Sequence, residues 1–280
     1  METFLVIVAI VAAILIGTLS RMRGAAKVPP LFWVALLASG ALPMWTGWQV
    51  LNPGEAVDEV RVTRLKDHRS FEIPENHSLL VTARFNDEIE DEKDEKSYKT
   101  AYSFTIQGDG WKEKVSGIMN IRQDDAQKLD AIAGETISEA GKQKSRKSGS
   151  NMQERYQLQG SGKVDLLVSN YEGTIAKSLL IEVIPSPPSA LLLWSACALL
   201  SILGIYFEVW NKCDKVAGDL AGVAFYAVFL ADGITPTSSF INIASAFLPG
   251  MFLGWGLVAG LGFLAAKYKA SVTPRKKEDE

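Results

Sequence analysis

Histidine and cysteine are scarce in this chain, whose 280 residues include two of each. Cys197 lies in an apolar segment and Cys213 in a short polar stretch, so no disulfide framework holds the polar middle of the chain. His68 and His77 could lie on neighbouring strands and bind a metal, but no cysteine accompanies them and their spacing matches no zinc pattern. We therefore expect surface or turn histidines, and neither a metal nor another cofactor.

Signatures of catalysis and of nucleic-acid binding are also missing. The sequence contains no Gly-x-Ser-x-Gly elbow, no phosphate-binding loop and no His-Glu-x-x-His helix. The net charge is −3, and no segment has the dense Lys/Arg face of a nucleic-acid binder. The sequence therefore predicts a non-enzymatic protein without a nucleic-acid partner.

Long apolar runs are present at both ends of the chain. The first, residues 4–19, is near the short end of what crosses about 30 Å of hydrocarbon. A cleaved signal peptide is the alternative, but no positive charge precedes this run, and Arg21, Arg23 and Lys27 follow it. That order is the reverse of a secretory signal and favours a retained transmembrane helix.

A second transmembrane helix is predicted at residues 31–50. Trp33 near its start, and Trp45 and Trp48 near its end, are placed as interfacial aromatic anchors are. Pro43 could kink this helix, which neighbouring helices can tolerate. Residues 1–50 are therefore expected to form two membrane spans.

Residues 51–186 change to a polar sequence with a strand pattern. Short runs rich in β-branched and aromatic residues alternate between apolar and polar positions, as half-buried strands do. The glycines of 109–110 and 160–162 supply turns that need a positive φ. The pattern predicts an extracytoplasmic antiparallel β-sandwich and resembles small jelly-roll or immunoglobulin-like domains. The predicted strands are residues 70–73, 79–85, 102–107, 115–121, 155–159, 164–169 and 178–184.

Two polar stretches interrupt these strands. Residues 87–96 form a charge run that could offer carboxylates to Ca²⁺, but it lacks the Asp-x-Asp-x-Asp-Gly arrangement that bends a loop around the ion. We expect a solvated hairpin loop there. Residues 123–150 are a helical and flexible insertion, with a helix predicted at residues 124–140 and a Gly/Ser/Lys-rich loop after it.

Residues 187–266 return to apolar sequence after a stiff, proline-rich connector. Three more transmembrane helices are predicted, at about residues 190–209, 216–231 and 241–266. Glycines four residues apart in the last two let helix backbones approach closely in lipid, although ordinary small residues of membrane helices give the same pattern. The candidate helix-packing residues are Gly218, Gly222, Gly250, Gly254, Gly256 and Gly260.

Positive charge predicts the orientation of these five spans. Lysines and arginines lie between spans one and two, between spans three and four, and after span five, whereas the loop between spans four and five has none. The positive-inside rule assigns the basic segments to the cytoplasm. The N-terminus and residues 51–186 would then be periplasmic, in a bacterial inner membrane, and residues 267–280 would be a cytoplasmic tail.

Three carboxylates lie in or beside the predicted spans: Glu208, Asp219 and Asp232. Acidic groups within spans often mark ion or proton paths, so Asp219 and Asp232 are candidates for such a path. Both lie near a helix end, where water or a basic neighbour can stabilise the charge, so the favoured interpretation is interfacial or paired carboxylates. The Pro249-Gly250 dipeptide is the one predicted break in a span.

Two functions of different classes fit these features. The first is a non-enzymatic subunit or scaffold of an inner-membrane complex. Its β-domain would bind a periplasmic protein or an envelope ligand, and its helices would pack in the lipid bilayer on other subunits or on a second copy. The alternative is a channel- or transporter-like protein whose outer domain senses or gates.

Overall fold

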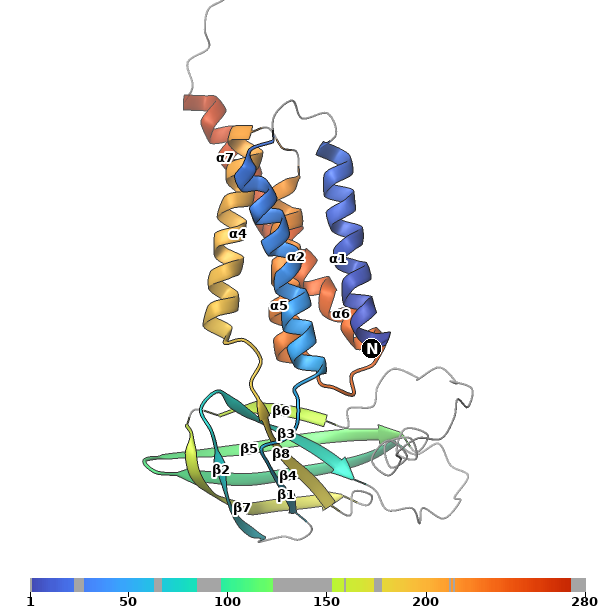
Figure 1. The fold of residues 1–280 in the computed structure, drawn as a ribbon, viewed down its shortest axis with the longest axis vertical. Helices are drawn as coiled ribbons and strands as arrows, with labels where there is room; N and C mark the ends of the chain where they lie inside the picture. The colour runs from blue at the N-terminus through green and yellow to red at the C-terminus, as the bar shows by residue number, and fades with distance from the viewer. Residues whose placement is uncertain are drawn as a thin grey trace, which may run out of the picture. The chain divides into compact units, whose positions relative to one another are not determined.

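The structure is a computed structural model that describes residues 2–22, 28–62, 67–84, 97–122, 153–158, 160–173, 178–211, 213 and 215–272. The chain divides into two compact units, which we call the helical unit (Met1–Asn52 with Pro187–Glu280) and the sheet unit (Pro53–Ser186) (Figure 1). The predicted charge run at 87–96 and the predicted insertion at 123–150 lie outside the described residues.

Five segments of the helical unit are long and apolar enough to cross a membrane, among the residues that the structure describes. The prediction of five such helices is confirmed, and the fifth continues six residues beyond its predicted end. The helices are α1 (Glu2–Arg21), α2 (Pro30–Leu51), α4 (Ala190–Asn211), α5 (Val216–Gly233) and the continuous series α6 (Phe240–Met251), η2 (Phe252–Val258) and α7 (Ala259–Val272).

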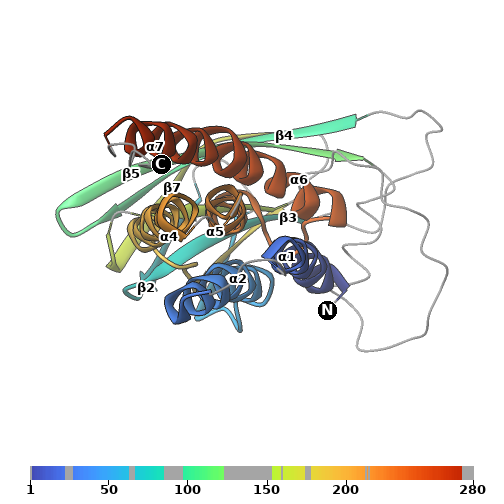
Figure 2. The same cartoon turned by 90° about the horizontal axis from the view of Figure 1, so that it is seen from above.

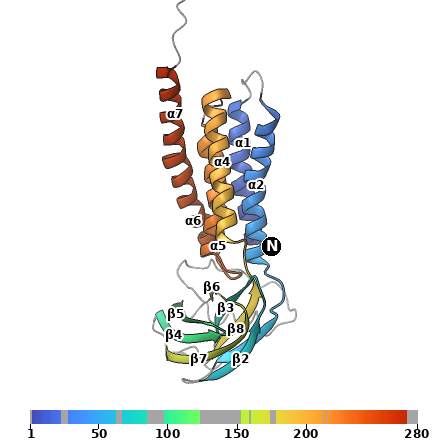
Figure 3. The same ribbon diagram turned by 90° about the vertical axis from the view of Figure 1, so that its left-hand side faces the viewer.

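Helix α5 is the centre of the helical unit. It packs against α1, α2, α4, α6 and η2, and Figure 2 shows it surrounded by them. Of the residues in its span, 78% are buried, compared with 17% in the span of α1 and 28% in that of α4. Alanine and glycine make up much of α5, so neighbouring helices can approach its backbone closely. At the outside of the unit, α7 packs against α4 (Figure 3).

The predicted break at Pro249-Gly250 is wrong, because helical structure continues through both residues. Proline has no N–H to donate to the carbonyl four residues before it, which weakens an α-helix locally. A stretch of π-helix follows and begins at Phe252. There the N–H of Ala259 reaches back five residues to the Gly254 carbonyl, as in a π-helical bond.

The sheet unit contains two antiparallel sheets of four strands each, among the described residues. Their strand orders are β1-β8-β3-β6 and β2-β7-β4-β5, and every pairing is antiparallel. The strands are β1 (Asp58–Val62), β2 (His68–Ile73), β3 (His77–Arg84), β4 (Ser97–Gly108), β5 (Trp111–Arg122), β6 (Gln153–Gln157), β7 (Gly162–Gly173) and β8 (Ser178–Pro185). A strand overlies each of the seven predicted runs.

Strand β1 was not predicted. Its sequence, DEVRV, has three charged residues among five and offers only Val60 and Val62 to the core. Pairing with β8 fixes it as a strand, and that partner lies more than 115 residues further along the chain. Local alternation in so short and polar a stretch could not reveal this pairing.

One hydrophobic cluster draws side chains from both sheets. Its members alternate along each strand, as expected when one sheet face is buried. The predicted positive φ is confirmed at Gly110 (+77°), in the turn between β4 and β5, and at Gly162 (+99°), at the start of β7. The cluster consists of Val60, Val62, Phe71, Ile73, Leu79, Val81, Tyr102, Phe104, Ile106, Val115, Met119, Val164, Leu166, Val168, Leu179, Ile181 and Val183.

Leu166 and Leu167 provide a matched test of this alternation, because they are adjacent in β7 but 0% and 47% exposed. We predict that Leu166→Ala destabilises the sheet unit by about 2–5 kcal/mol, through lost burial and a residual cavity. Leu167→Ala should change stability by less than about 0.5 kcal/mol. Hydrogen exchange of β4 and β7 peptides, measured by mass spectrometry on the full chain in mild detergent, checks this. Equal effects of the two changes would contradict the assigned core face.

Candidate functional site

Four of the candidate glycines meet where α5 crosses α6 and η2. A Cβ placed on Gly254 would overlap the backbone nitrogen of Gly222 and lie 2.5 Å from the Gly218 carbonyl oxygen. A Cβ on Gly250 would lie 2.8 Å from the backbone nitrogen of Tyr226. Because these neighbours are backbone atoms, they cannot rotate away, so the crossing requires glycine at its closest points.

Gly256 and Gly260 do not join this crossing. Outside the nearby backbone of the same helix and the two chain neighbours, no atom of the described chain lies within 4 Å of a Cβ placed on either residue. The buried face of this long helix passes through Gly250, Gly254, Val258 and Gly262, so residues 256 and 260 lie on another face. Gly204 of α4 was missed by the sequence analysis, although a Cβ there would lie 2.7 Å from the Cα of Ala217.

Asp219 lies beside the glycine crossing and is 2% exposed. The Thr18 hydroxyl of α1 donates to its Oδ2 at 2.7 Å, and the Trp255 indole Nε1–H of η2 donates to its Oδ1 at 2.9 Å. Each carboxylate oxygen therefore accepts a hydrogen bond from a different helix. Asp219 also lies in the first turn of α5, where the helix dipole favours a negative charge. The arrangement joins α1, α5 and η2 at one point.

Asp232 lies at the opposite end of α5 and is exposed. Thirteen residues separate it from Asp219, or about 20 Å at a rise of about 1.5 Å per residue. Alanine, valine, leucine and aromatic side chains fill most of the buried positions between them. The structure therefore does not bring the two predicted path residues together.

Two polar contacts fix the end of the helical unit where α4 meets α5 and α7. Glu208 accepts a hydrogen bond through Oε2 from the backbone N–H of Ala217 at 3.2 Å. Lys269 donates to the Val209 carbonyl at 3.0 Å, and its ammonium lies 5.0 Å from the centre of the Trp210 ring. Negative charge at the start of α5 and positive charge at the end of α4 both complement the helix dipoles.

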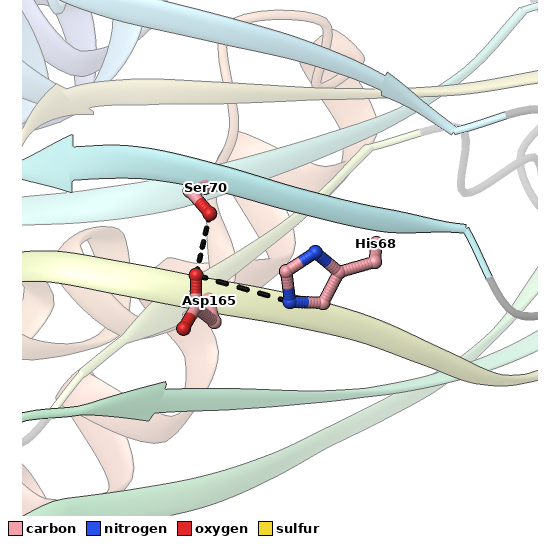
Figure 4. Close-up of polar contacts among 3 residues, drawn as sticks. All are labelled: His68, Ser70 and Asp165. Carbon is pink, nitrogen blue, oxygen red and sulfur yellow. Dashed lines mark hydrogen bonds and ion pairs between the residues drawn. The ribbon is translucent and has the colours of Figure 1, made fainter.

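The two histidines lie in different sheets. His77 of β3 contacts the Glu75 carbonyl through Nδ1 at 2.9 Å, within its own turn. His68 of β2 lies with Nε2 3.8 Å from Asp165 Oδ1, and the Ser70 hydroxyl donates to that same oxygen at 2.5 Å (Figure 4). Among the described residues, no group of three or more His, Cys, Asp or Glu side chains could hold a metal.

The Ser70, Asp165 and His68 set has the residue types of a hydrolase triad but not its order. In such a triad the imidazole lies between the hydroxyl and the carboxylate, so that it can take the hydroxyl proton. Here the carboxylate lies between the other two groups. His68 and Asp165 are also about 60% exposed, at 60% and 59%. This geometry does not activate Ser70 as a nucleophile.

A partly buried polar cluster of Tyr102, Glu154 and Tyr156 joins the two sheets at the edge formed by β5 and β6. The hydroxyls of Tyr102 and Tyr156 each donate to Glu154 Oε2 at 2.5 Å, and Tyr156 also contacts the Ser116 carbonyl at 3.2 Å. Gly117 leaves room for the cluster, since a Cβ there would overlap the Glu154 carboxylate. Burial, then the hydrogen bond to Glu154, raises the pKa of both phenols well above 10.0.

The partners of Asp219 and the Tyr102 cluster were not predicted. One signal in the sequence was usable: Trp255 lies near the middle of a predicted span, unlike the tryptophans at span ends, and an indole N–H away from water needs an acceptor. Thr18 lies 201 residues from Asp219, and Glu154 lies 52 residues from Tyr102. No local pattern reports contacts over such separations.

Comparison with known proteins adds no relative. No protein-family model, no curated protein and no solved structure matches this chain.

Gly254 and Gly256 allow a matched test of the helix crossing. We predict that Gly254→Ala destabilises the helical unit by about 1–3 kcal/mol, because the added methyl group meets backbone. Gly256→Ala should be neutral or stabilising by up to about 1 kcal/mol, because alanine favours a helix and meets no atom there. Thermal unfolding in mild detergent, followed by fluorescence-detected size exclusion, measures both. A loss of the same size in Gly256→Ala would refute the assignment.

The raised pKa values of Tyr102 and Tyr156 predict that the sheet unit loses stability at alkaline pH. A phenol whose pKa is raised on folding contributes stability that is complete below its unfolded pKa near 10.0 and is lost as the pH rises above that value. Each such phenol contributes a slope of about 1.4 kcal/mol per pH unit there. Tyr102→Phe should cost about 1–3 kcal/mol at pH 8 and make the decline above pH 10 shallower.

Circular dichroism of the full chain during denaturation at pH 8 to 11 measures this effect. The control is Tyr268→Phe, which removes an exposed phenol from α7. A decline above pH 10 that is identical in the wild type and in Tyr102→Phe would rule out a contribution of the cluster.

Proposed function

We propose that this protein is a non-enzymatic, integral subunit or scaffold of a bacterial inner-membrane complex. Five helices of the helical unit cross the bilayer. The sheet unit is a periplasmic β-sandwich that binds a protein or envelope partner. Helix packing in the bilayer holds the chain together and leaves one face, defined by Gly256 and Gly260, for a partner helix.

Exposed aromatic residues support membrane insertion. Trp33 lies at the start of α2 and Trp48 at its end, while Trp194 and Trp210 lie at the two ends of α4; they are 47% to 56% exposed. The pair in α4 is sixteen residues apart, or about 24 Å along the axis. Aromatic side chains at both borders of an apolar band are typical of helices that cross a bilayer.

The shared core supports the sandwich arrangement of the sheet unit. Inward side chains of both sheets form one cluster, as in two sheets that pack face to face. At one edge, β1 contacts β2, and at the other β5 contacts β6. The hydrogen bonds of Tyr102 to Glu154 and of Tyr156 to the Ser116 carbonyl join the sheets at the second edge.

The orientation follows from charge. Arginines and lysines follow α1, precede α5 and follow the apolar part of α7, which are the same end of five alternating spans. The positive-inside rule assigns this end to the cytoplasm. The sheet unit is inserted between α2 and α4, and therefore belongs to the periplasmic side.

The observation that carries the choice of a subunit is the closed packing of α5. Small residues of α5 contact the backbones of neighbouring helices, and Asp219 is hydrogen-bonded by two of them. A channel- or transporter-like function needs a polar path through the bundle. The apolar stretch of about 20 Å between Asp219 and Asp232 weighs against that alternative.

Affinity purification of the tagged chain from its native membrane, with mass spectrometry of co-eluting proteins, tests the proposal. We predict a stoichiometric set of membrane partners. The double change Gly256→Leu and Gly260→Leu should lower partner recovery by about tenfold, because two leucines prevent close helix approach. The matched control is the double change Ala9→Leu and Ala13→Leu, because both residues are exposed and lie four residues apart on α1.

A lone monomer in mild detergent without co-eluting proteins would overturn the subunit function. A homo-oligomer without other proteins would favour the channel-like alternative. Partner recovery that is unchanged in the double variant would remove Gly256 and Gly260 from the interface and leave the sheet unit as the binding part.

A further inference from the structure

A cavity of about 280 Å³ opens between the end of α5 and the first two turns of α6. Its lining combines one carboxylate, one amide and one hydroxyl with apolar side chains. The residues are Phe229, Asp232, Gly233, Ile234, Asn242, Ser245 and Ala246. A lining that combines polar and apolar groups suits a ligand that is itself amphipathic.

The polar part of the cavity has the charge that suits a cation. Asp232 lies in the last turn of α5, where the helix dipole is negative and the final carbonyls lack intrahelical partners. No basic residue lies in that turn, and the connection from Asp232 to Phe240 has none either. A carboxylate at the unfavourable end of a helix raises the free energy of the chain, and a bound cation would lower it.

The walls of the cavity are held in place by hydrogen bonds within α5, α6 and the connection between them. Tyr226 of α5 is fully buried, and its hydroxyl donates to the Ile243 carbonyl of α6 at 3.1 Å. The connection is ordered by the Thr235 N–H, which donates to the Ser238 hydroxyl at 2.9 Å, and Ser239 caps α6 through the N–H of Asn242. The cavity therefore exists without a ligand to shape it.

The size and donor set indicate the chemical class of the ligand. The cavity offers a metal ion a single carboxylate. A hard cation such as Ca²⁺ takes six to eight oxygen ligands, so this donor set does not suit it. A primary ammonium group needs fewer partners, because it carries three N–H donors for a carboxylate, an amide oxygen and helix carbonyls. Exposed Phe240, Ile241 and Leu248 give α6 an apolar surface outside the cavity.

We propose that this cavity binds a primary ammonium group, as carried by the headgroup of an ethanolamine phospholipid in the outer leaflet. Asp232 pairs with the ammonium, Asn242 accepts a hydrogen bond from it, and the acyl chains lie along the exposed apolar face of α6. This inference rests on the proposed membrane insertion and not on the identity of any protein partner.

Native mass spectrometry of the full chain in mild detergent tests the site. Phospholipids with ethanolamine, choline and glycerol headgroups and identical acyl chains are titrated separately. We predict the tightest binding for ethanolamine. Asp232→Asn should weaken it by about fivefold, as expected for loss of a partly exposed ion pair. Ser245→Phe should prevent binding by filling the cavity, and Glu55→Gln, which removes an exposed charge outside the cavity, should have no effect.

The outcomes separate the sources of the ammonium group. Competition by free ethanolamine would show that the headgroup suffices, and lipid binding without such competition would show that the acyl chains also contribute; both support the site. Equal binding of the three headgroups, or equal binding by wild type and Asp232→Asn, would overturn it. A chain that stays in solution without detergent would instead overturn the proposed membrane insertion.

Discussion

The backbone contact between α5 and the helix that begins with α6 is the constraint on which the helical unit depends. In the proposed membrane insertion, burying apolar side chains against one another gains little, because lipid tails are equally apolar, so helix association relies on close packing and hydrogen bonds. Gly222 and Gly254 provide the closest packing, and Asp219 supplies the hydrogen bonds, to Thr18 of α1 and Trp255 of η2. The π-helical stretch lies at this contact. It carries Gly254 and Trp255 together, so the glycine crossing and the carboxylate junction form one structural element.

The sheet unit is stabilised in a different way from the helical unit. Water surrounds it in the proposed orientation, so burial of its apolar cluster drives folding and close backbone approach is not needed. Its weak points are the strand edges, where two sheets of four strands expose unpaired backbone groups. At the β5 and β6 edge, the phenols of Tyr102 and Tyr156 converge on Glu154. The Glu154 carboxylate accepts both hydrogen bonds only while the two phenols keep their protons, so the stability of this edge depends on pH.

Some features of this fold are visible in local sequence patterns, and others depend on residues far apart in the chain. The helices and seven strands were predictable because apolar runs and two-residue alternation are local. The glycine spacing indicated a packed helix pair but could not distinguish Gly250 and Gly254 from Gly256 and Gly260, since both pairs have the same spacing and only the packed face separates them. Strand β1 and the donors to Asp219 depend on partners far along the chain. Those features depend on the assembled fold. The π-helical stretch depends on it as well, because it lies where Gly254 packs against α5, just after Pro249 weakens the α-helix.

The two aspartates of α5 show how position decides the role of a residue type. Asp219 lies in the first turn, where the helix dipole stabilises a negative charge, and both of its oxygens accept hydrogen bonds in a buried setting. Asp232 lies in the last turn, where the dipole opposes the charge, and it borders an open cavity. A carboxylate of the first kind has its interactions satisfied by the protein and contributes to packing. Asp232 can still pair with a cation. The proposed ligand site therefore lies at the end of α5 near Asp232 and not at the junction around Asp219.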